Sequence, residues 1–188
     1  MERTALSGGF SDAPVEAALA FRAAMSAMAR PGRTEVLSGA RPPAPLSVAA
    51  GTLLLTLCDP ETPVQLAGGH DTRAVRDWIA FHTGAPIVPP PEAAFAIGTW
   101  EALLPLDGYR IGLPEYPDRS ATLVVERDAH ATVAAVLEGP GIRTVAALDL
   151  PETEAFETNA RYFPLGLDFF FTAGDRVAAL PRSSKVSL

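Results

Sequence analysis

The chain has 188 residues, 48% of them hydrophobic, and a formal net charge of −7 at pH 7. This length suits one domain with a sizeable core, and the acidic balance with scattered arginines excludes non-specific binding to nucleic acid. The longest apolar run, LLLTLC within residues 53–58, is too short to span a membrane, and the opening MERTALSGGFSD lacks the apolar core of a signal peptide. We therefore expect a cytoplasmic protein with one domain over residues 1–188, flexible at 1–11 and 184–188.

The first predicted element is a helix that follows Ser11 or Asp12, either of which can cap it, with Pro14 in its first turn. The sequence ARPGR at residues 29–33 ends this helix, because proline cannot continue it and glycine tolerates the reversal. Apolar residues at helical spacing predict a stripe along it, formed by Ala18, Phe21, Met25 and Met28. The TEVLSG run that follows predicts a short strand.

Helices and strands then alternate along the middle of the chain. A mostly apolar helix is predicted over about residues 46–57 and is expected to be buried almost all round. The VQLAG run predicts a strand, and a helix capped by Asp71 or Thr72 ends at Gly84. Residues 94–98 predict another strand, followed by a short helix and by the long irregular connection GYRIGLPEYPDRS, a kind of loop that often carries function.

The last third of the chain is rich in β-structure. The runs ATLVVE, TVAAVLEG and IRTVAALDL predict strands, and a helix is expected over about residues 151–161. Residues 167–172 and 176–180 predict a hairpin turned at AGD. Because hairpins require antiparallel pairs, the expected fold class is α/β, a single-domain three-layer sandwich with a mixed sheet flanked by helices.

The inventory of reactive side chains is small. Three histidines, His70, His82 and His130, and a single cysteine have none of the spacings of a zinc site, so no metal is expected. Cys58 lies in an apolar run and is predicted to be an inert buried thiol. Lys185, the only lysine, lies close to the C-terminus, so a Schiff base with pyridoxal phosphate is rejected. The sequence also has no glycine-rich phosphate loop, and we expect no bound cofactor.

Two polar residues leave alternatives open. His82 lies at the predicted end of a helix, where it is either an ordinary cap, which we favour, or part of a ligand site. Glu115, in the loop LPEYPDRSAT, is either a solvated acid, which we favour, or a general base.

Asp168 stands out because it precedes three phenylalanines in the stretch FPLGLDFFF. In a hairpin centred on Gly174, Asp168 lies across from Leu180 and diagonal to Arg182 on one face of the sheet. An unpaired carboxylate buried there would be strongly destabilising. We therefore predict a structural ion pair between Asp168 and Arg182, and keep a role in a site as the alternative.

The phenylalanines that follow alternate across the predicted strand. Phe169 and Phe171 point to one face and Phe170 to the other, so both faces need apolar cover. One face is expected to meet the helices. The other meets either more of the core or another subunit.

Several stretches of the chain, taken in order, resemble one family, the H subunit of the carbon-phosphorus lyase system (PhnH). They are FRAAMSAMARPGR, LLLTLCDPETPV, FHTGAPIV, GLPEYPDRSATLVVE, LEGPGI and FPLGLDFFFTAGDRVAALPRSS, from about residue 12 to residue 186. The resemblance implies a subunit of the core complex of phosphonate catabolism. With its sister subunits, such a protein takes part in forming ribose 1-phosphonate 5-triphosphate from ATP and a phosphonate.

The same resemblance implies a fold similar to the large domain of type I pyridoxal-phosphate transferases, without the cofactor. It also implies a homodimer in isolation, contacts with the other core subunits, and no assigned catalytic residue. The positions that it marks as a candidate cleft or partner surface are His82, Thr83, Glu115, Asp168 and Arg182.

Two hypotheses about function follow. In the first, the chain is an accessory subunit that acts by assembly, and it turns over neither ATP nor phosphonate alone. In the second, it is an enzyme subunit with its own phosphate-ester site, binding a nucleotide or phosphonate near His82, Glu115 and Arg182. We favour the first, because the sequence contains no recognisable catalytic motif.

Overall fold

The computed structural model describes residues 7–127 and 132–188, which contain two β-sheets and five α-helices. The helices are α1 (Ala13–Ala29), α2 (Val48–Leu57), α3 (Arg73–His82), α4 (Trp100–Leu103) and α5 (Glu154–Arg161). The strands of the larger sheet are β1 (Glu35–Val36), β2 (Val64–Leu66), β3 (Phe95–Gly98), β4 (Thr122–Glu126), β7 (Asp168–Ala173) and β8 (Arg176–Leu180). The smaller sheet contains β5 (Val133–Glu138), β6 (Ala146–Leu150) and β9 (Lys185–Ser187).

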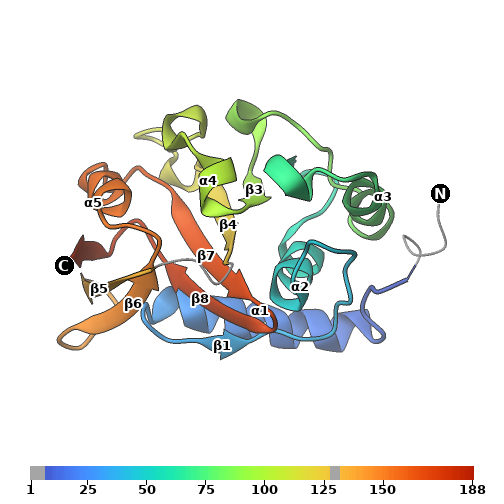
Figure 1. Ribbon diagram of the computed structural model, residues 1–188, viewed down its shortest axis with the longest axis horizontal. Coiled ribbons are helices and arrows are strands. Elements are labelled where there is room, and N and C mark those ends of the chain that lie inside the picture. The colour runs from blue at the N-terminus through green and yellow to red at the C-terminus, as the bar shows by residue number, and fades with distance from the viewer. Residues whose placement is uncertain (1–6, 128–131) are drawn as a thin grey trace.

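The larger sheet is mixed, as predicted. Its strands follow the order β1-β8-β7-β4-β3-β2, in which β2, β3, β4 and β7 run parallel. The predicted hairpin joins β8 to β7 antiparallel, and β1 extends the antiparallel end. Figure 1 shows these strands crossing the middle of the molecule.

The smaller sheet corrects one expectation. The sequence predicts a flexible end at residues 184–188, but residues 185–187 form β9 and pair with β5. The hairpin of β5 and β6 therefore belongs to a separate three-stranded sheet, and β4 does not join it. At the other end, residues 1–6 lie outside the described part, while Trp78 Nε1 donates to the Ser7 carbonyl at 3.1 Å.

Apolar cores lie on both faces of the larger sheet. Helices α1, α2 and α3 cover one face, where Val124 and Phe170 point. Helices α4 and α5 and the smaller sheet cover the other, where Phe169 and Phe171 point. All three phenylalanines are thus buried within the chain itself, and the alternative that a subunit covers Phe170 is wrong.

Side-chain caps begin helices α2 and α3. The Ser47 hydroxyl accepts from Ala50 N at 3.1 Å, and the Ser47 amide donates to the buried carboxylate of Glu126 at 2.6 Å. Helix α2 is buried over most of its length, as expected. Thr72 caps α3 by accepting from Val75 N at 3.2 Å, which confirms one of the two predicted caps.

Helix α1 packs against the core with the face opposite to its predicted apolar stripe. An apolar stripe ordinarily faces the core, yet Phe21 and Met25 are 49% and 53% exposed. Ala18 is also exposed and Met28 is half-buried. The buried positions are Ala20, Ala24 and Ala27. Because these small side chains let the helix approach α2 and β8 closely, the larger ones are left outside.

The end of α1 packs closely against the hairpin of β5 and β6. Gly141, in the turn of that hairpin, has a φ of +80°, and a Cβ there would lie 2.0 Å from the carbonyl oxygen of Ala29. Gly32 makes a reciprocal contact, because its Cβ would lie 2.8 Å from Ala146 Cβ. Only glycine permits so close an approach at these two points.

Cys58 is buried, with 7% of its surface exposed, as the sequence predicts. Burial, helped by the charge of Asp59, raises the pKa of its thiol from 9.0 to about 12. Since the fold favours the neutral thiol, this contribution to stability is complete below pH 9 and is lost as the pH rises from 9 towards 12.

A thiol reagent at pH 8 should therefore react with Cys58 on the order of 10³-fold more slowly in the folded protein than in denaturant, from the thiolate fraction alone. The release of the reagent's chromophore measures this rate. Equal rates in the two states would show that the thiol is accessible and ionised in the fold.

Candidate functional site

Asp168 and Arg182 form the strongest polar contact among the sequence-predicted residues. The Arg182 amide donates to Asp168 Oδ1 at 2.8 Å, its Nε donates to the same oxygen at 3.1 Å, and its Nη2 contacts Oδ2. The side chains are only 13% and 21% exposed for Arg182 and Asp168. The predicted ion pair is therefore confirmed.

The same arginine also ties down the long loop before β4. Its Nη1 donates to the carbonyl of Pro117 at 2.7 Å, and its Nη2 contacts the hydroxyl of Ser120. Four of the five N–H groups that a guanidinium offers are then engaged within the chain. Arg182 is thereby committed to holding the loop in place.

The predicted register of the hairpin is wrong by one residue. Phe169 pairs with Leu180 and Ala173 with Arg176, so the turn consists of Gly174 and Asp175 alone. Asp168 is consequently not across from Leu180. The ion pair still forms, because Arg182 follows β8 closely enough for its backbone and its side chain to reach the carboxylate.

Glu115 lies in an exposed stretch of this loop, which agrees with a solvated acid. Leu113 and Tyr116 close a tight turn around it through mutual backbone hydrogen bonds of 3.1 and 2.9 Å. The Tyr116 ring packs under the guanidinium carbon of Arg119 at 4.1 Å. The loop thus presents Glu115 to solvent at the edge of the structure.

His82 and Thr83 end helix α3, as their position in the sequence predicts. The Thr83 hydroxyl donates to the carbonyl of Ile79 at 2.9 Å and accepts from Ala85 N at 3.1 Å. The His82 ring packs against Trp78 and Phe81, with centroid distances of 5.1 and 4.8 Å. This geometry fits the favoured interpretation of a helix end.

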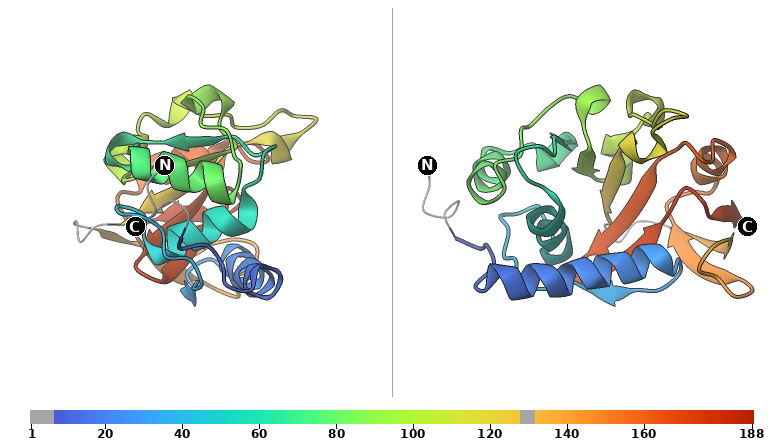
Figure 2. Two further views of the ribbon diagram at one scale, coloured as in Figure 1. Left: turned by 90° about the vertical axis from the view of Figure 1, so that its right-hand side faces the viewer. Right: turned by 180° about the vertical axis from the view of Figure 1, so that it is seen from behind.

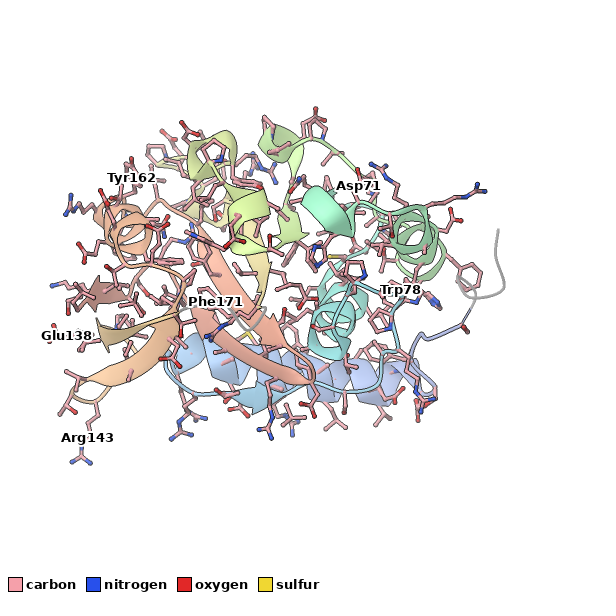
Figure 3. All side chains as sticks on the ribbon, viewed as in Figure 1. Asp71, Trp78, Glu138, Arg143, Tyr162 and Phe171 are labelled. Atoms are coloured by element: carbon pink, nitrogen blue, oxygen red, sulfur yellow. The ribbon has the colours of Figure 1, made fainter. Side chains whose placement is uncertain are left out.

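The structure does not join the predicted site residues in one cleft. A small hollow beside His82 is lined by residues 7–10, Ala13 and Leu55, and contains neither Glu115 nor Arg182. Arg182 instead lies with the loop before β4. Figure 3 shows Trp78, on the helix that carries His82, on the opposite side of the molecule from Tyr162.

A groove of about 630 Å³ is a feature that sequence reasoning missed. It lies between α5 and the segment that follows α4. Its floor is apolar and is formed mainly by Leu106, Tyr109, Ile111, Ala155 and Leu167, which are buried or half-buried. Leu104 and Tyr162 line it and remain well exposed, and Tyr162 stands at the end of α5 in Figure 3.

Three polar side chains of the groove, those of Tyr109, Glu152 and Asn159, have hydrogen-bond partners within the chain. Glu152 accepts from Trp100 Nε1 at 3.0 Å and from Ala155 N at 3.3 Å. The Tyr109 hydroxyl donates to Gln65 Oε1 at 3.2 Å, and burial raises the pKa of this tyrosine. The exposed carboxylates of Asp107 and Glu154 lie at its rim, the half-buried Glu152 also lines it, and the described lining contains no lysine or arginine. The groove is therefore apolar inside and acidic at its edge.

Metal-binding clusters and membrane-spanning helices are both absent from the residues that the structure describes. No group of three or more histidine, cysteine, aspartate or glutamate side chains in residues 7–127 and 132–188 is placed to hold a metal ion. Over the same residues, no helix is both long and apolar enough to traverse a membrane.

The fold and these surfaces define a single-domain α/β protein with an apolar, acid-rimmed groove. The family model described as bacterial phosphonate metabolism protein (PhnH) matches residues 8–187. The chain belongs to this family, which confirms the resemblance seen in its sequence.

Two relatives are similar over nearly their whole length. One, from Rhizobium meliloti (strain 1021), is 41% identical over 189 residues, 96% of this chain and 94% of the relative, and is named alpha-D-ribose 1-methylphosphonate 5-triphosphate synthase subunit PhnH. The other, from Stutzerimonas stutzeri, is 29% identical over 197 residues, 96% of this chain and 95% of the relative. It is named putative C-P lyase subunit protein HtxG.

Proposed function

We propose that this chain is a subunit of a carbon-phosphorus lyase core complex. In this role it contributes to forming ribose 1-phosphonate 5-triphosphate from ATP and a phosphonate, by assembly with sister subunits and without catalysis of its own. The proposal extends to a homodimer in isolation and to a cytoplasmic location. The names of two full-length relatives, both called subunits, support it.

The observation that carries the proposal is that this chain, a member of the family, exposes large apolar side chains on two surfaces. Large apolar side chains stand in solvent on the outer side of α1 and, separately, around the groove at Leu104 and Tyr162. Contiguous apolar surfaces of this kind mark sites of protein association. Two such surfaces suit a subunit with two kinds of neighbour.

We assign the groove to a sister subunit. Its apolar floor would take large aliphatic or aromatic side chains, and the carboxylates at its rim would attract lysine or arginine on the same segment. The anionic rim repels phosphate groups, so a triphosphate is a poor occupant. We also infer that the fold is similar to that of the type I pyridoxal-phosphate transferases, which the mixed sheet between helical layers supports.

Charges introduced at the groove should break the contact with the sister subunits. When the tagged chain is co-expressed with the other core subunits, Leu104→Asp with Tyr162→Asp should lower their recovery about tenfold or more, because carboxylates would then face apolar groups. Val145→Asp is the matched control, since Val145 is 59% exposed and does not line the groove. Equal recovery with both variants would remove the groove from the proposal.

The role itself is tested in two assays. Cells that lack the chain should fail to grow on methylphosphonate as the source of phosphorus, and the parent sequence should restore growth. The purified chain, incubated alone with ATP and methylphosphonate, should release no adenine. Adenine released by the chain alone would contradict a role by assembly.

A further inference from the structure

The loop before β4 has a turn whose tip is mostly apolar. Residues 113–116 read Leu-Pro-Glu-Tyr, and all four are exposed. Leu113 and Tyr116 are 53% and 49% exposed. Turns at the surface are ordinarily built from glycine, asparagine, aspartate, serine and proline. Two large apolar side chains in this position therefore call for a reason outside the turn itself.

The turn has a fixed shape. Leu113 and Tyr116 exchange backbone hydrogen bonds of 3.1 and 2.9 Å, and Arg119 N donates to the Tyr116 carbonyl at 3.2 Å. Gly112 enters the turn with a φ of +88°, and a Cβ there would lie 2.6 Å from the carbonyl oxygen of Pro117. Only glycine allows so close an approach. The guanidinium of Arg119 also packs over the Tyr116 ring.

The base of the loop is fixed as well. Ala121 N donates to the Arg110 carbonyl at 2.8 Å and closes the loop where it meets β4. Arg182, which is largely buried, donates to the Pro117 carbonyl and contacts Ser120. Ordering a loop costs conformational entropy. These contacts meet that cost, and the tip is presented in one geometry before any partner binds.

The tip is separate from the two apolar surfaces described above. Leu113 and Tyr116 do not line the groove, although Ile111 does. Helix α1 lies at the bottom of Figure 1, whereas the segment between α4 and β4 lies at the top. Figure 2 (left) shows the loop, in yellow-olive, extending outward on one side of the molecule. A neighbour could therefore bind the tip without covering α1.

The charge at the tip restricts what can cover it. Glu115 stands between Leu113 and Tyr116 in the turn, and its side chain has no ion pair or hydrogen bond within the part of the chain that the structure describes. A contact that buries the two apolar side chains would also remove water from this carboxylate. The covering surface therefore has to supply a lysine or arginine.

Other occupants fit less well. The groove of a second copy is apolar, but its rim is acidic and its described lining contains no lysine or arginine. Phosphate groups and anionic lipid surfaces are repelled by a carboxylate. The occupant that fits is a protein surface with an apolar pocket edged by basic side chains.

We propose that Leu113 and Tyr116 anchor this chain in an apolar, basic-rimmed pocket of a sister subunit, where Glu115 pairs with a lysine or arginine. The inference deepens the proposed function by adding a contact outside the groove, and it rests on that function. A few buried anchors supply most of the energy of an interface. A loop that is already ordered loses little entropy when it binds.

Recovery of the sister subunits tests the anchors. When the tagged chain is co-expressed with the other core subunits, Leu113→Asp with Tyr116→Asp should lower their recovery about tenfold or more. Val145→Asp with Phe81→Asp is the matched control and should leave recovery unchanged. Val145 and Phe81 are 59% and 51% exposed, and both lie outside the loop and the groove.

Glu115→Lys tests the charge. It should lower recovery about tenfold, and Glu115→Gln should lower it less. Raising NaCl from about 50 to 500 mM should weaken the parent contact more than that of Glu115→Gln, because salt screens exposed ion pairs. Asp175→Lys makes the same change of charge in the turn between β7 and β8, at the opposite end of the sheet, and should leave recovery unchanged.

Two glycines test the shape of the loop. Gly112→Ala should lower recovery about fivefold or more, because its Cβ would displace the Pro117 carbonyl and with it the tip. Gly174→Ala is the control, since Gly174 also has a positive φ but no atom lies within 4 Å of the added Cβ. It should leave recovery unchanged.

Three results would overturn this inference alone: equal recovery with Leu113→Asp, Tyr116→Asp and with its control, no effect of Glu115→Lys, or equal effects at the two glycines. If the anchor variant instead weakened self-association in sedimentation equilibrium and left recovery unchanged, the tip would bind a second copy, against the inference. A parent chain that recovers no sister subunit would contradict the proposed function itself, and the inference with it.

Discussion

Asp168→Ala is expected to lower the free energy of unfolding by about 3 kcal/mol, the lower end of the cost of breaking a buried pair. The variant leaves the guanidinium of Arg182 largely buried without its carboxylate, and removes the acceptor of the Arg182 amide. Urea denaturation measures the change. Asp168→Asn keeps the shape of the side chain and should still cost about 2 kcal/mol, because the amide cannot supply the charge.

The control lies on the same hairpin. Asp175 and Arg176 form an ion pair at 3.5 Å whose side chains are 56% and 62% exposed. Asp175→Ala should change stability by less than about 0.5 kcal/mol, as is usual for exposed pairs. If Asp168→Asn were as thermally stable as the parent from about pH 5 to 8, the pair would have no structural role.

Phe156→Ala is expected to cost about 4 kcal/mol, because it empties a fully buried site. The Phe156 ring stacks on Trp100 at 4.8 Å and meets Phe169 edge-on at 4.9 Å. The variant also removes the anchor of α5, which forms one wall of the groove. We therefore expect it to lower the recovery of sister subunits.

Phe81→Ala is the control for Phe156→Ala, because it removes the same side chain from an exposed position. Phe81 is 51% exposed, so its loss should cost less than about 1 kcal/mol in the same denaturation experiment. A similar loss for both variants would mean that the aromatic cluster around Phe156 does not anchor α5.

The sequence predicts the last hairpin and its ion pair because three signals agree there. Phenylalanines fill both faces of β7, AGD supplies a turn, and a lone acid requires a partner. The register is missed by one residue because a turn of two residues replaces the expected three. Arg182 still reaches Asp168, since a long side chain tolerates such a shift.

The outward face of α1 is missed for a different reason. With alanine at eight of its positions and charge at only two, the helix offers little contrast between its sides. Side-chain size then determines which face of α1 turns to the core, because alanines fit against α2 and β8 where Phe21 and Met25 do not.

The groove could not be predicted from any single stretch. Its walls come from residues 104–111 and 152–167, which the fold brings together around the aromatic cluster. Strand β9 is missed because its pairing partner, β5, is distant in the sequence. In both cases the feature depends on contacts between segments that are distant in the sequence.

The glycine contact between the hairpin turn and the end of α1 bears on the cost of association. Gly141 seats the turn directly on the carbonyl of Ala29, so the final turn of the helix is braced from a segment more than a hundred residues away in sequence. A helix end held rigid in this way loses little conformational entropy on association. A modest contact area then gives useful affinity. A bulkier residue at Gly141 would push this turn away from Ala29 and weaken association without contacting the partner chain.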